Sequence, residues 1–285
     1  MPTDHSHGSA AAGQDAGRPV AIAVAPNGGR RTKADHPGLP ILPAEIGRAA
    51  GECLEAGAAM IHVHVRDGAG RHLLDADAYR AAIAAVRREC GDRLVVQVST
   101  ESVGIYGPAE QMAVVRDLRP EAASLALREL APDASGEAGL AAFLGFMKRE
   151  RIMPQVILYT PGDAARLADL ESRGIVPFDD VPVLFVLGRY GDGPPSRPVG
   201  LEAFLPHAHG RSWMLCAFGA GEARCGTAAA LLGGDVRVGF ENNLHRPDAS
   251  LAANNADLVE AVAAPLRALG VRLAGADGLR ASWRR

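Results

Sequence analysis

Residues 43–65 read PAEIGRAAGECLEAGAAMIHVHV and combine the two patterns that decide the fold. The first part is an amphipathic helix pattern that begins at Pro43, a residue suited to the first turn of a helix. It ends at Gly57, which suits a left-handed C-terminal cap. The last part, residues 59–65, is a short apolar run typical of a buried strand. A helix that leads directly into such a strand is typical of parallel α/β proteins.

The same alternation runs along the chain from Pro19 onward. Strands are predicted at eight apolar runs, residues 20–25, 59–65, 94–99, 122–127, 154–159, 181–187, 212–218 and 236–240. Helices are predicted at residues 44–57, 76–90, 109–119, 137–150, 162–173, 200–208, 222–232 and 251–268. Eight such units in about 250 residues match the size of a (β/α)8 TIM barrel. We therefore predict a single barrel domain over residues 18–285 and a disordered N-terminal leader over residues 1–17.

A doubly wound open sheet is the alternative fold. It usually has fewer strands and a glycine-rich phosphate loop after the first one. Here the first predicted strand is followed only by Asn27-Gly28-Gly29, which does not match that fingerprint. The barrel is the better prediction, and it places catalytic groups at the C-terminal ends of the strands and in the loops that follow them.

The composition excludes several classes of function. The 30 Lys and Arg against 33 Asp and Glu give a net charge of −3, without the basic excess of proteins that bind nucleic acid or anionic membranes. The chain has no apolar run long enough to span a bilayer and no signal-peptide pattern. The four cysteines lack Cys-x-x-Cys spacing and are expected to be buried thiols of a reduced compartment. We expect a cytoplasmic protein with small-molecule partners.

The second predicted strand carries a pair of histidines. In the run MIHVHV of residues 60–65, the two-residue period of a strand puts His62 and His64 on one face and the apolar side chains on the other. Because the apolar side chains must face the helices, both imidazoles are expected to face the barrel axis. A divalent cation would satisfy both rings, and imidazole nitrogen suits Zn²⁺. A hydrogen-bonded pair at the barrel mouth is the alternative.

Glu241 is the candidate for a third metal ligand. It follows the last predicted strand, which in a closed barrel lies beside the first strand and one strand away from the histidine pair. Two histidines and a glutamate with an open fourth position form a known catalytic zinc site. Alternatively, Glu241 caps the next helix. Among the other histidines of the barrel, we expect only His245, in the last loop, to approach the site.

Polar residues at other strand ends complete the predicted site. They are Asn27 and Arg30 after the first strand, Ser99, Thr100 and Glu101 at the third, Ser124 followed by Arg128 and Glu129 at the fourth, and Gln155, Tyr159 and Thr160 at the fifth. Hydroxyls and carboxylates at one rim suit oxyanion stabilisation and proton transfer. Substrate binding is assigned to Asn27, Arg30, Thr100, Ser124 and Gln155.

Longer motifs carry a resemblance to a known family. They are APNGGRRTKADHPGLPILPAEI (25–46), ECLEAGAAMIHVHVRD (52–67), VQVSTE (96–101), RPEAASLAL (119–127), VPVLFVLG (181–188) and RVGFENN (237–243). Over about residues 19–270 the chain resembles the β-keto acid cleavage enzyme family. The resemblance implies a (β/α)8 barrel that forms a homotetramer, with Zn²⁺ held by His62, His64 and Glu241. It also implies an acyltransferase that converts a β-keto acid and acetyl-CoA, its co-substrate, to acetoacetate and a new acyl-CoA.

The resemblance assigns further roles and reveals a departure. It implies that Ser99 holds the substrate carboxylate or oxyanion and that Arg237 orients the catalytic base. The family prototype has an aspartate as that base directly after the metal-binding glutamate, whereas this chain has Asn242. An amide cannot accept that proton at neutral pH. We hypothesise that Glu101, where the prototype has glycine, supplies the carboxylate instead.

Two more departures concern the substrate. Arg30 and Gln155 align with acidic residues of the prototype, whose substrate bears an amino group. Loss of those charges favours a keto acid without an amino group, such as a dicarboxylate that Arg30 would bind. Alternatively, Arg30 binds a phosphate of CoA or points into solvent. Two other functions remain open, a non-catalytic barrel that binds a keto acid or acyl-CoA, and a zinc hydrolase. The hydrolase is disfavoured because it carries His-x-His on its first strand.

Overall fold

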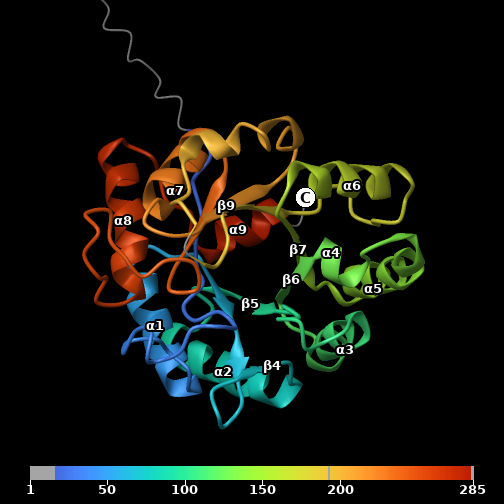
Figure 1. Cartoon of the computed structure of the whole chain (residues 1–285), viewed down its shortest axis with the longest axis horizontal. Coiled ribbons are helices and arrows are strands. Elements are labelled where there is room, and N and C mark those ends of the chain that lie inside the picture. Colours follow the sequence, from blue (N-terminus) through green and yellow to red (C-terminus); the bar gives the residue numbers. More distant parts are fainter. Residues whose placement is uncertain (1–16, 192, 284–285) are drawn as a thin grey trace, which may run out of the picture.

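The computed structural model describes residues 17–191 and 193–283 of the chain. Eight parallel strands close into a barrel in the order β1-β10-β9-β8-β7-β6-β5-β2 (Figure 1). The strands are β1 (Ile22–Val24), β2 (Met60–Val63), β5 (Val95–Ser99), β6 (Ala122–Ala126), β7 (Met153–Leu158), β8 (Val183–Leu187), β9 (Trp213–Ala217) and β10 (Asp235–Val238). The predicted (β/α)8 barrel is therefore confirmed and the open sheet is excluded. Apart from Gly17, the predicted leader lies outside the described residues.

Helices surround the barrel. They are α1 (Pro43–Ala56), α2 (Ala76–Cys90), α3 (Pro108–Leu118), α4 (Leu127–Leu130), α5 (Glu137–Glu150), α6 (Pro161–Ser172), α7 (Glu222–Leu231), α8 (Asn255–Ala268) and α9 (Ala276–Trp283). Seven of the eight predicted helices match this set within a few residues. The helix predicted at residues 200–208 is wrong, because only short 3₁₀ turns form there, at Pro198–Leu201 and Leu205–His207. Pro206 lies inside that segment and cannot donate the backbone hydrogen bond that a continuous helix needs.

The strand predicted at residues 59–65 ends early. β2 stops at Val63, and the chain then leaves the barrel to form a hairpin of β3 (Val65–Arg66) and β4 (His72–Leu73), which pair antiparallel. The backbone of His64 at the exit is satisfied by a side chain. Asn27 Nδ2 donates to the His64 carbonyl oxygen at 2.9 Å, and Asn27 Oδ1 accepts from the His64 N–H at 3.3 Å. Asn27 thus supplies the hydrogen bonds that the backbone of a neighbouring strand would otherwise make.

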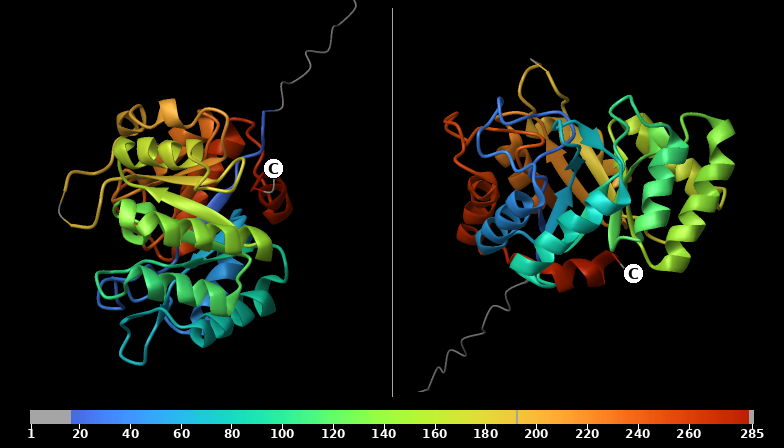
Figure 2. Two further views of the ribbon diagram at one scale, coloured as in Figure 1. Left: turned by 90° about the vertical axis from the view of Figure 1, so that its right-hand side faces the viewer. Right: turned by 90° about the horizontal axis from the view of Figure 1, so that it is seen from below.

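The two ends of the barrel are built differently. At the N-terminal end, α9 lies across the opening, where Leu279 and Trp283 are buried in one cluster with inward residues such as Met60 and Met214. Figure 2 shows α9, in red, at the end opposite the loops that follow β1 and β8. All four cysteines are buried and free, as expected. Among the described residues, no helix combines the length and apolarity needed to cross a membrane.

Candidate metal centre and active site

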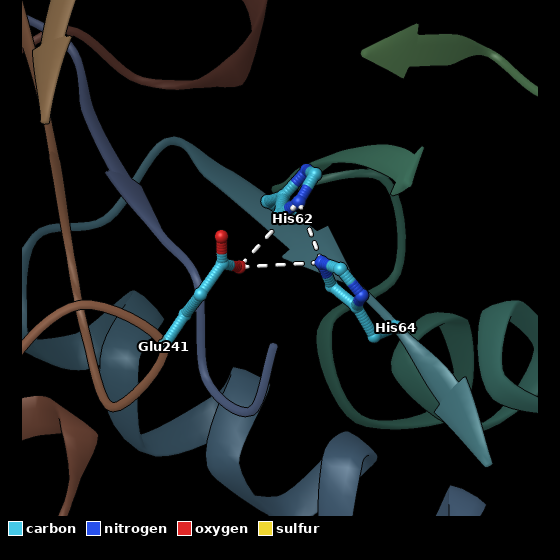
Figure 3. Close-up of side chains that lie close together, drawn as sticks. All are labelled: His62, His64 and Glu241. Atoms are coloured by element: carbon cyan, nitrogen blue, oxygen red, sulfur yellow. Dashed lines mark hydrogen bonds and ion pairs between the residues drawn. The ribbon is translucent and has the colours of Figure 1, made fainter. Parts of the chain in front are cut away.

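His62, His64 and Glu241 converge at the C-terminal end of the barrel (Figure 3). His62 lies on β2, His64 directly after it, and Glu241 three residues after β10, with β1 between the two strands. The Nε2 atoms of the histidines are 3.1 Å apart, and Glu241 Oε2 lies 3.6 Å from His62 Nε2 and 3.3 Å from His64 Nε2. Ligands about 2.05 Å from a tetrahedral Zn²⁺ lie about 3.3 Å from one another. The donor spacing therefore fits such an ion.

Neighbouring side chains orient two of these candidate ligands, His62 and Glu241. Gln97 Oε1 lies 2.8 Å from His62 Nδ1 and accepts a hydrogen bond from its N–H, which leaves the Nε2 lone pair free for a metal. Burial lowers the pKa of His62 to about 3, so the ring is neutral. Arg237 Nη2 donates to Glu241 Oε1 at 3.0 Å. Burial opposes ionisation of Glu241, but the charge of Arg237 outweighs it and holds the carboxyl pKa well below its usual value.

The cluster contains polar atoms that the protein itself does not satisfy. Glu241 Oε2 is buried and accepts no hydrogen bond from the described residues, and its nearest polar neighbours are the two imidazole Nε2 atoms at 3.3 and 3.6 Å. A buried charged atom without a partner is costly, whereas a cation bound at this point would compensate it. A buried His-His-Glu set with one carboxylate oxygen free is therefore suited to a divalent cation.

A cavity of about 570 Å³ opens beside this cluster. Its lining includes all three candidate metal ligands and the four residues predicted to act in catalysis or substrate binding that reach it, namely Arg30, Ser99, Glu101 and Arg237, together with strand-end residues described below. Arg237 Nε and Nη1 are buried and have no partner within the described chain, so this edge of the guanidinium is available to an anionic ligand. The structure thus brings the predicted metal ligands and most of the predicted catalytic groups together at one surface.

Glu101 is poised between His64 and Arg30. Its Oε2 atom lies 3.8 Å from His64 Nδ1, and its Oε1 atom lies 3.6 Å from Arg30 Nε. Oε2 is buried and lacks a hydrogen-bond partner in the described structure. Burial raises the pKa of the Glu101 carboxyl above its usual value. The cavity therefore holds a carboxylate oxygen that can accept a proton.

Five residues predicted for the site stand behind the cavity wall instead of lining it; they are Asn27, Thr100, Ser124, Gln155 and Asn242. Thr100 Oγ1 donates to the Ser124 carbonyl oxygen at 2.8 Å, and Gln155 Oε1 accepts from Gln97 at 3.1 Å. Asn242 Oδ1 lies 3.5 Å from Arg237 Nη2. With Asn27 bound to the His64 backbone, most of this group supports the site by hydrogen bonds within the protein.

His72, and not the expected His245, is the further histidine that lies near the site. His245 is exposed, and its backbone pairs with Leu251. His72, on the hairpin, packs its ring 5.2 Å from the His64 ring and donates from Nε2 to the Glu101 carbonyl oxygen at 2.8 Å. The sequence interpretation placed His72 in a loop away from the site, although Asp67-Gly68 between the two short strands is a hairpin signal that could have indicated this return.

Other cavity residues follow the rule that functional groups lie after strand ends. Arg128 and Tyr159, noted at the ends of the fourth and fifth predicted strands, both line the cavity. The sequence interpretation missed Arg189 and Tyr190 after β8 and Phe218 after β9. The same strand-end rule, applied to β8 and β9, would have found them.

Comparisons with known proteins identify the family of the chain. The family model for beta-keto acid cleavage enzymes matches residues 19–283. The 3-keto-5-aminohexanoate cleavage enzyme of Fusobacterium nucleatum is 29% identical over 280 residues, covering 91% of this chain and 95% of the relative. The 3-oxoadipate:acetyl-CoA acetyltransferase of Cupriavidus necator is 27% identical over 262 residues, covering 87% of this chain and 88% of the relative.

Solved structures share the fold. A ternary complex of ObcA with a C4-CoA adduct and oxalate superposes with a TM-score of 0.70 at 20% identity, covering 87% of this chain and 68% of that one. A type I 3-dehydroquinate dehydratase from Clostridium difficile gives a TM-score of 0.56 at 10% identity, covering 89% of this chain and 94% of that one. The family match extends over nearly the whole barrel, and the chain belongs to the beta-keto acid cleavage enzyme family.

Proposed function

We propose that this chain is a zinc-dependent enzyme that cleaves a β-keto acid by exchange with acetyl-CoA, giving acetoacetate and the acyl-CoA of the remainder. The observation that carries the proposal is the buried His62, His64 and Glu241 cluster beside a cavity that also holds an unpartnered carboxylate oxygen of Glu101. The relatives named above are described as acting on different keto acids, so the reaction type is supported more strongly than the substrate.

His62, His64 and Glu241 would hold the metal. Two neutral imidazoles and one carboxylate are a ligand set that zinc favours. When bound, the ion supplies Lewis acidity toward the keto oxygen of the substrate. Gln97 keeps His62 in the tautomer that can bind it, and Arg237 keeps one oxygen of Glu241 directed at the histidines.

Glu101 acts as the base in this proposal. It takes a proton from the carbon between the two carbonyl groups of the keto acid, and the electron pair of that C–H bond forms the enolate. Arg30 lies beside Oε1, and Oε2, which has no hydrogen-bond partner in the described structure, is left to take the proton. Asn242 does not line the cavity, and an amide would not serve as the base. Because Glu101 must be ionised and burial raises its pKa, the rate should increase with pH through that pKa.

The cavity rim favours an anionic substrate tail. Arg30, Arg128 and Arg189 are exposed residues that line the cavity. Glu129 also lines it, but Glu129 Oε2 already accepts from the Ser102 N–H at 3.0 Å and from Gln111 at 2.8 Å. Arginines at the mouth suit carboxylates and the phosphates of CoA better than an ammonium group. We therefore propose a keto acid without an amino group, and a dicarboxylate in particular.

The test measures acetoacetate and acyl-CoA formation from acetyl-CoA and three keto acids, 3-oxoadipate, 3-oxohexanoate and 3-keto-5-aminohexanoate, together with the zinc content. We expect turnover of 3-oxoadipate and loss of activity on chelation. Glu101→Gln should reduce kcat by about 10²–10⁴-fold while zinc stays bound, and Glu202→Gln, an exposed site, should not.

Three other outcomes would contradict parts of the proposal. Full activity of Glu101→Gln would exclude Glu101 as the base. Turnover of the amino-bearing acid alone would exclude the assigned substrate class. Binding of acetyl-CoA without any product would favour the non-catalytic alternative. The homotetramer implied by the resemblance stays a prediction that sedimentation would test.

A further inference from the structure

Tyr190 places a buried hydroxyl in the cavity wall. The residue lies three positions after the end of β8 and lines the same cavity as the metal ligands. Its hydroxyl oxygen is shielded from solvent and has no hydrogen-bond partner in the part of the chain that the structure describes. A buried hydroxyl without a partner costs free energy, and such groups in native proteins usually have a functional explanation. The partner of this group must therefore come from outside the described chain.

Contacts on two sides hold the Tyr190 ring in place. Phe218 packs against it edge to face, with the ring centroids 4.8 Å apart and the planes at 66°. The guanidinium carbon of Arg30 lies 5.3 Å from the ring centroid. Aromatic and cation–π contacts of this kind fix the direction in which the hydroxyl points. The group is thus preorganised before any ligand binds.

Gly28 shows how close the hydroxyl lies to the metal cluster. A Cβ atom at this position would be 3.0 Å from the Tyr190 hydroxyl oxygen and 2.7 Å from Glu241 Cγ. The hydroxyl and the Glu241 side chain therefore converge on the space above one glycine. Gly28 also has a φ of +61°, which an L side chain rarely adopts. Both requirements favour glycine here and keep the space between Tyr190 and Glu241 open.

The hydroxyl keeps its proton at neutral pH and is able to donate a hydrogen bond. Burial raises the pKa of Tyr190 well above its usual value, and the nearby carboxylates of Glu241 and Glu101 raise it further. The proton therefore stays on the phenol oxygen and needs an acceptor. No hydrogen bond to Glu241 is formed in the described structure, although Glu241 Oε2 is also without a partner.

We propose that Tyr190 is a catalytic residue that donates a hydrogen bond to the keto oxygen of the substrate as that oxygen gains negative charge. The inference rests on the proposed function. When Glu101 removes the proton from the substrate carbon, the C–H electron pair forms a C=C bond and the C=O electron pair moves onto the keto oxygen. A preorganised donor at that oxygen stabilises the transition state more than the ground state.

The test compares Tyr190→Phe with the wild type and with Tyr106→Phe. Tyr106→Phe makes the same chemical change in the loop between β5 and α3, and Tyr106 does not line the cavity. We expect Tyr190→Phe to lower kcat by about 10²-fold with 3-oxoadipate and acetyl-CoA, with a much smaller change in KM. Zinc affinity should be unchanged. The Tm of the metal-free protein should be equal or higher, because Phe removes a polar group that has no partner there. Tyr106→Phe should behave as the wild type.

Each alternative result has a distinct meaning. Wild-type kcat in Tyr190→Phe would overturn this inference alone. A lower Tm of the metal-free variant, or weaker zinc binding with kcat restored at saturating zinc, would show a structural or metal-positioning role and would also overturn it. A wild-type protein that forms no acetoacetate from any of the keto acids would overturn the proposed function and this inference together.

Discussion

At the scale of single residues, the metal site depends on a side chain that would not touch the metal. Gln97 on β5 neighbours β2, and the register places it directly opposite His62. Its oxygen accepts from His62 Nδ1, while its amide nitrogen donates to Gln155 at 3.1 Å. Both ends of the amide are therefore used, and the orientation of the imidazole is fixed from behind. Such partners orient the ligand ring and raise its basicity.

Replacing Gln97 should weaken metal binding without removing a ligand. Gln97→Leu leaves His62 Nδ1 without an acceptor, and we expect zinc affinity to fall by about 10–100-fold. Gln97→Glu keeps an oxygen acceptor at the same length. It should therefore bind zinc more tightly than Gln97→Leu does. Competition with a chromophoric chelator measures both. Equal zinc affinity of Gln97→Leu and the wild type would contradict the role of Gln97.

At the scale of elements, the start of α1 depends on one carboxylate. Glu45 accepts hydrogen bonds from the backbone N–H groups of Ile41 at 2.8 Å and Leu42 at 3.0 Å, and from Lys33 Nζ at 2.6 Å. A carboxylate in the first turn also interacts favourably with the helix dipole. Partial burial alone would raise the pKa of Glu45, but these hydrogen bonds outweigh it and lower the pKa to about 2.

Removal of this carboxylate should destabilise the protein in a pH-dependent way. Glu45→Ala should lower the free energy of unfolding by about 1 kcal/mol at pH 7. Because the pKa is lower in the folded state than the ordinary 4.5, the contribution is present above pH 4.5 and is lost as pH falls toward about 2. Urea unfolding at several pH values should show the difference from wild type shrinking over that range. Glu52→Ala, an exposed site on the same helix, is the control. A difference independent of pH would contradict this account.

At the scale of the whole molecule, closure of the barrel explains which parts of the site could be predicted. His62, His64 and Glu241 come from distant segments, yet β10, β1 and β2 must be neighbours once the sheet closes, so the metal cluster follows from local patterns alone. Asn27 shows the limit, because a polar residue after a strand can face the cavity or the backbone of the next strand. Only the tertiary hydrogen bonds decide between these.

Short structural elements were missed for a related reason; besides α4 they are the β3–β4 hairpin and α9. The β3–β4 hairpin and α9 are short, and their sequences lack a long apolar period. Both are stabilised by tertiary contacts. The hairpin is held by the hydrogen bond from His72 to the Glu101 carbonyl oxygen, and α9 by packing against the open N-terminal end of the barrel. Packing across the whole molecule is not visible in a local pattern, so the places where these elements pack emerge only from the structure.

Because α9 closes the N-terminal end of the barrel, a substitution in it should lower the free energy of unfolding without changing zinc affinity at the other end. Leu279 is 1% exposed and belongs to the cluster of inward residues at the N-terminal end of the barrel, opposite the metal cluster. Leu279→Ala should lower the free energy of unfolding by about 2–5 kcal/mol, because it removes buried methyl groups and leaves a cavity. The exposed Ala281→Ser should change it by no more than about 0.5 kcal/mol.

Urea unfolding of the metal-free proteins measures both variants, and zinc titration of the folded proteins measures the site. Zinc affinity should be unchanged in Leu279→Ala, because in (β/α)8 barrels the N-terminal face contributes stability and the C-terminal face carries the chemistry. A loss of stability below about 1 kcal/mol would mean that α9 packs only loosely against the barrel. A parallel loss of zinc affinity would instead show that the two ends of the barrel are coupled through its interior.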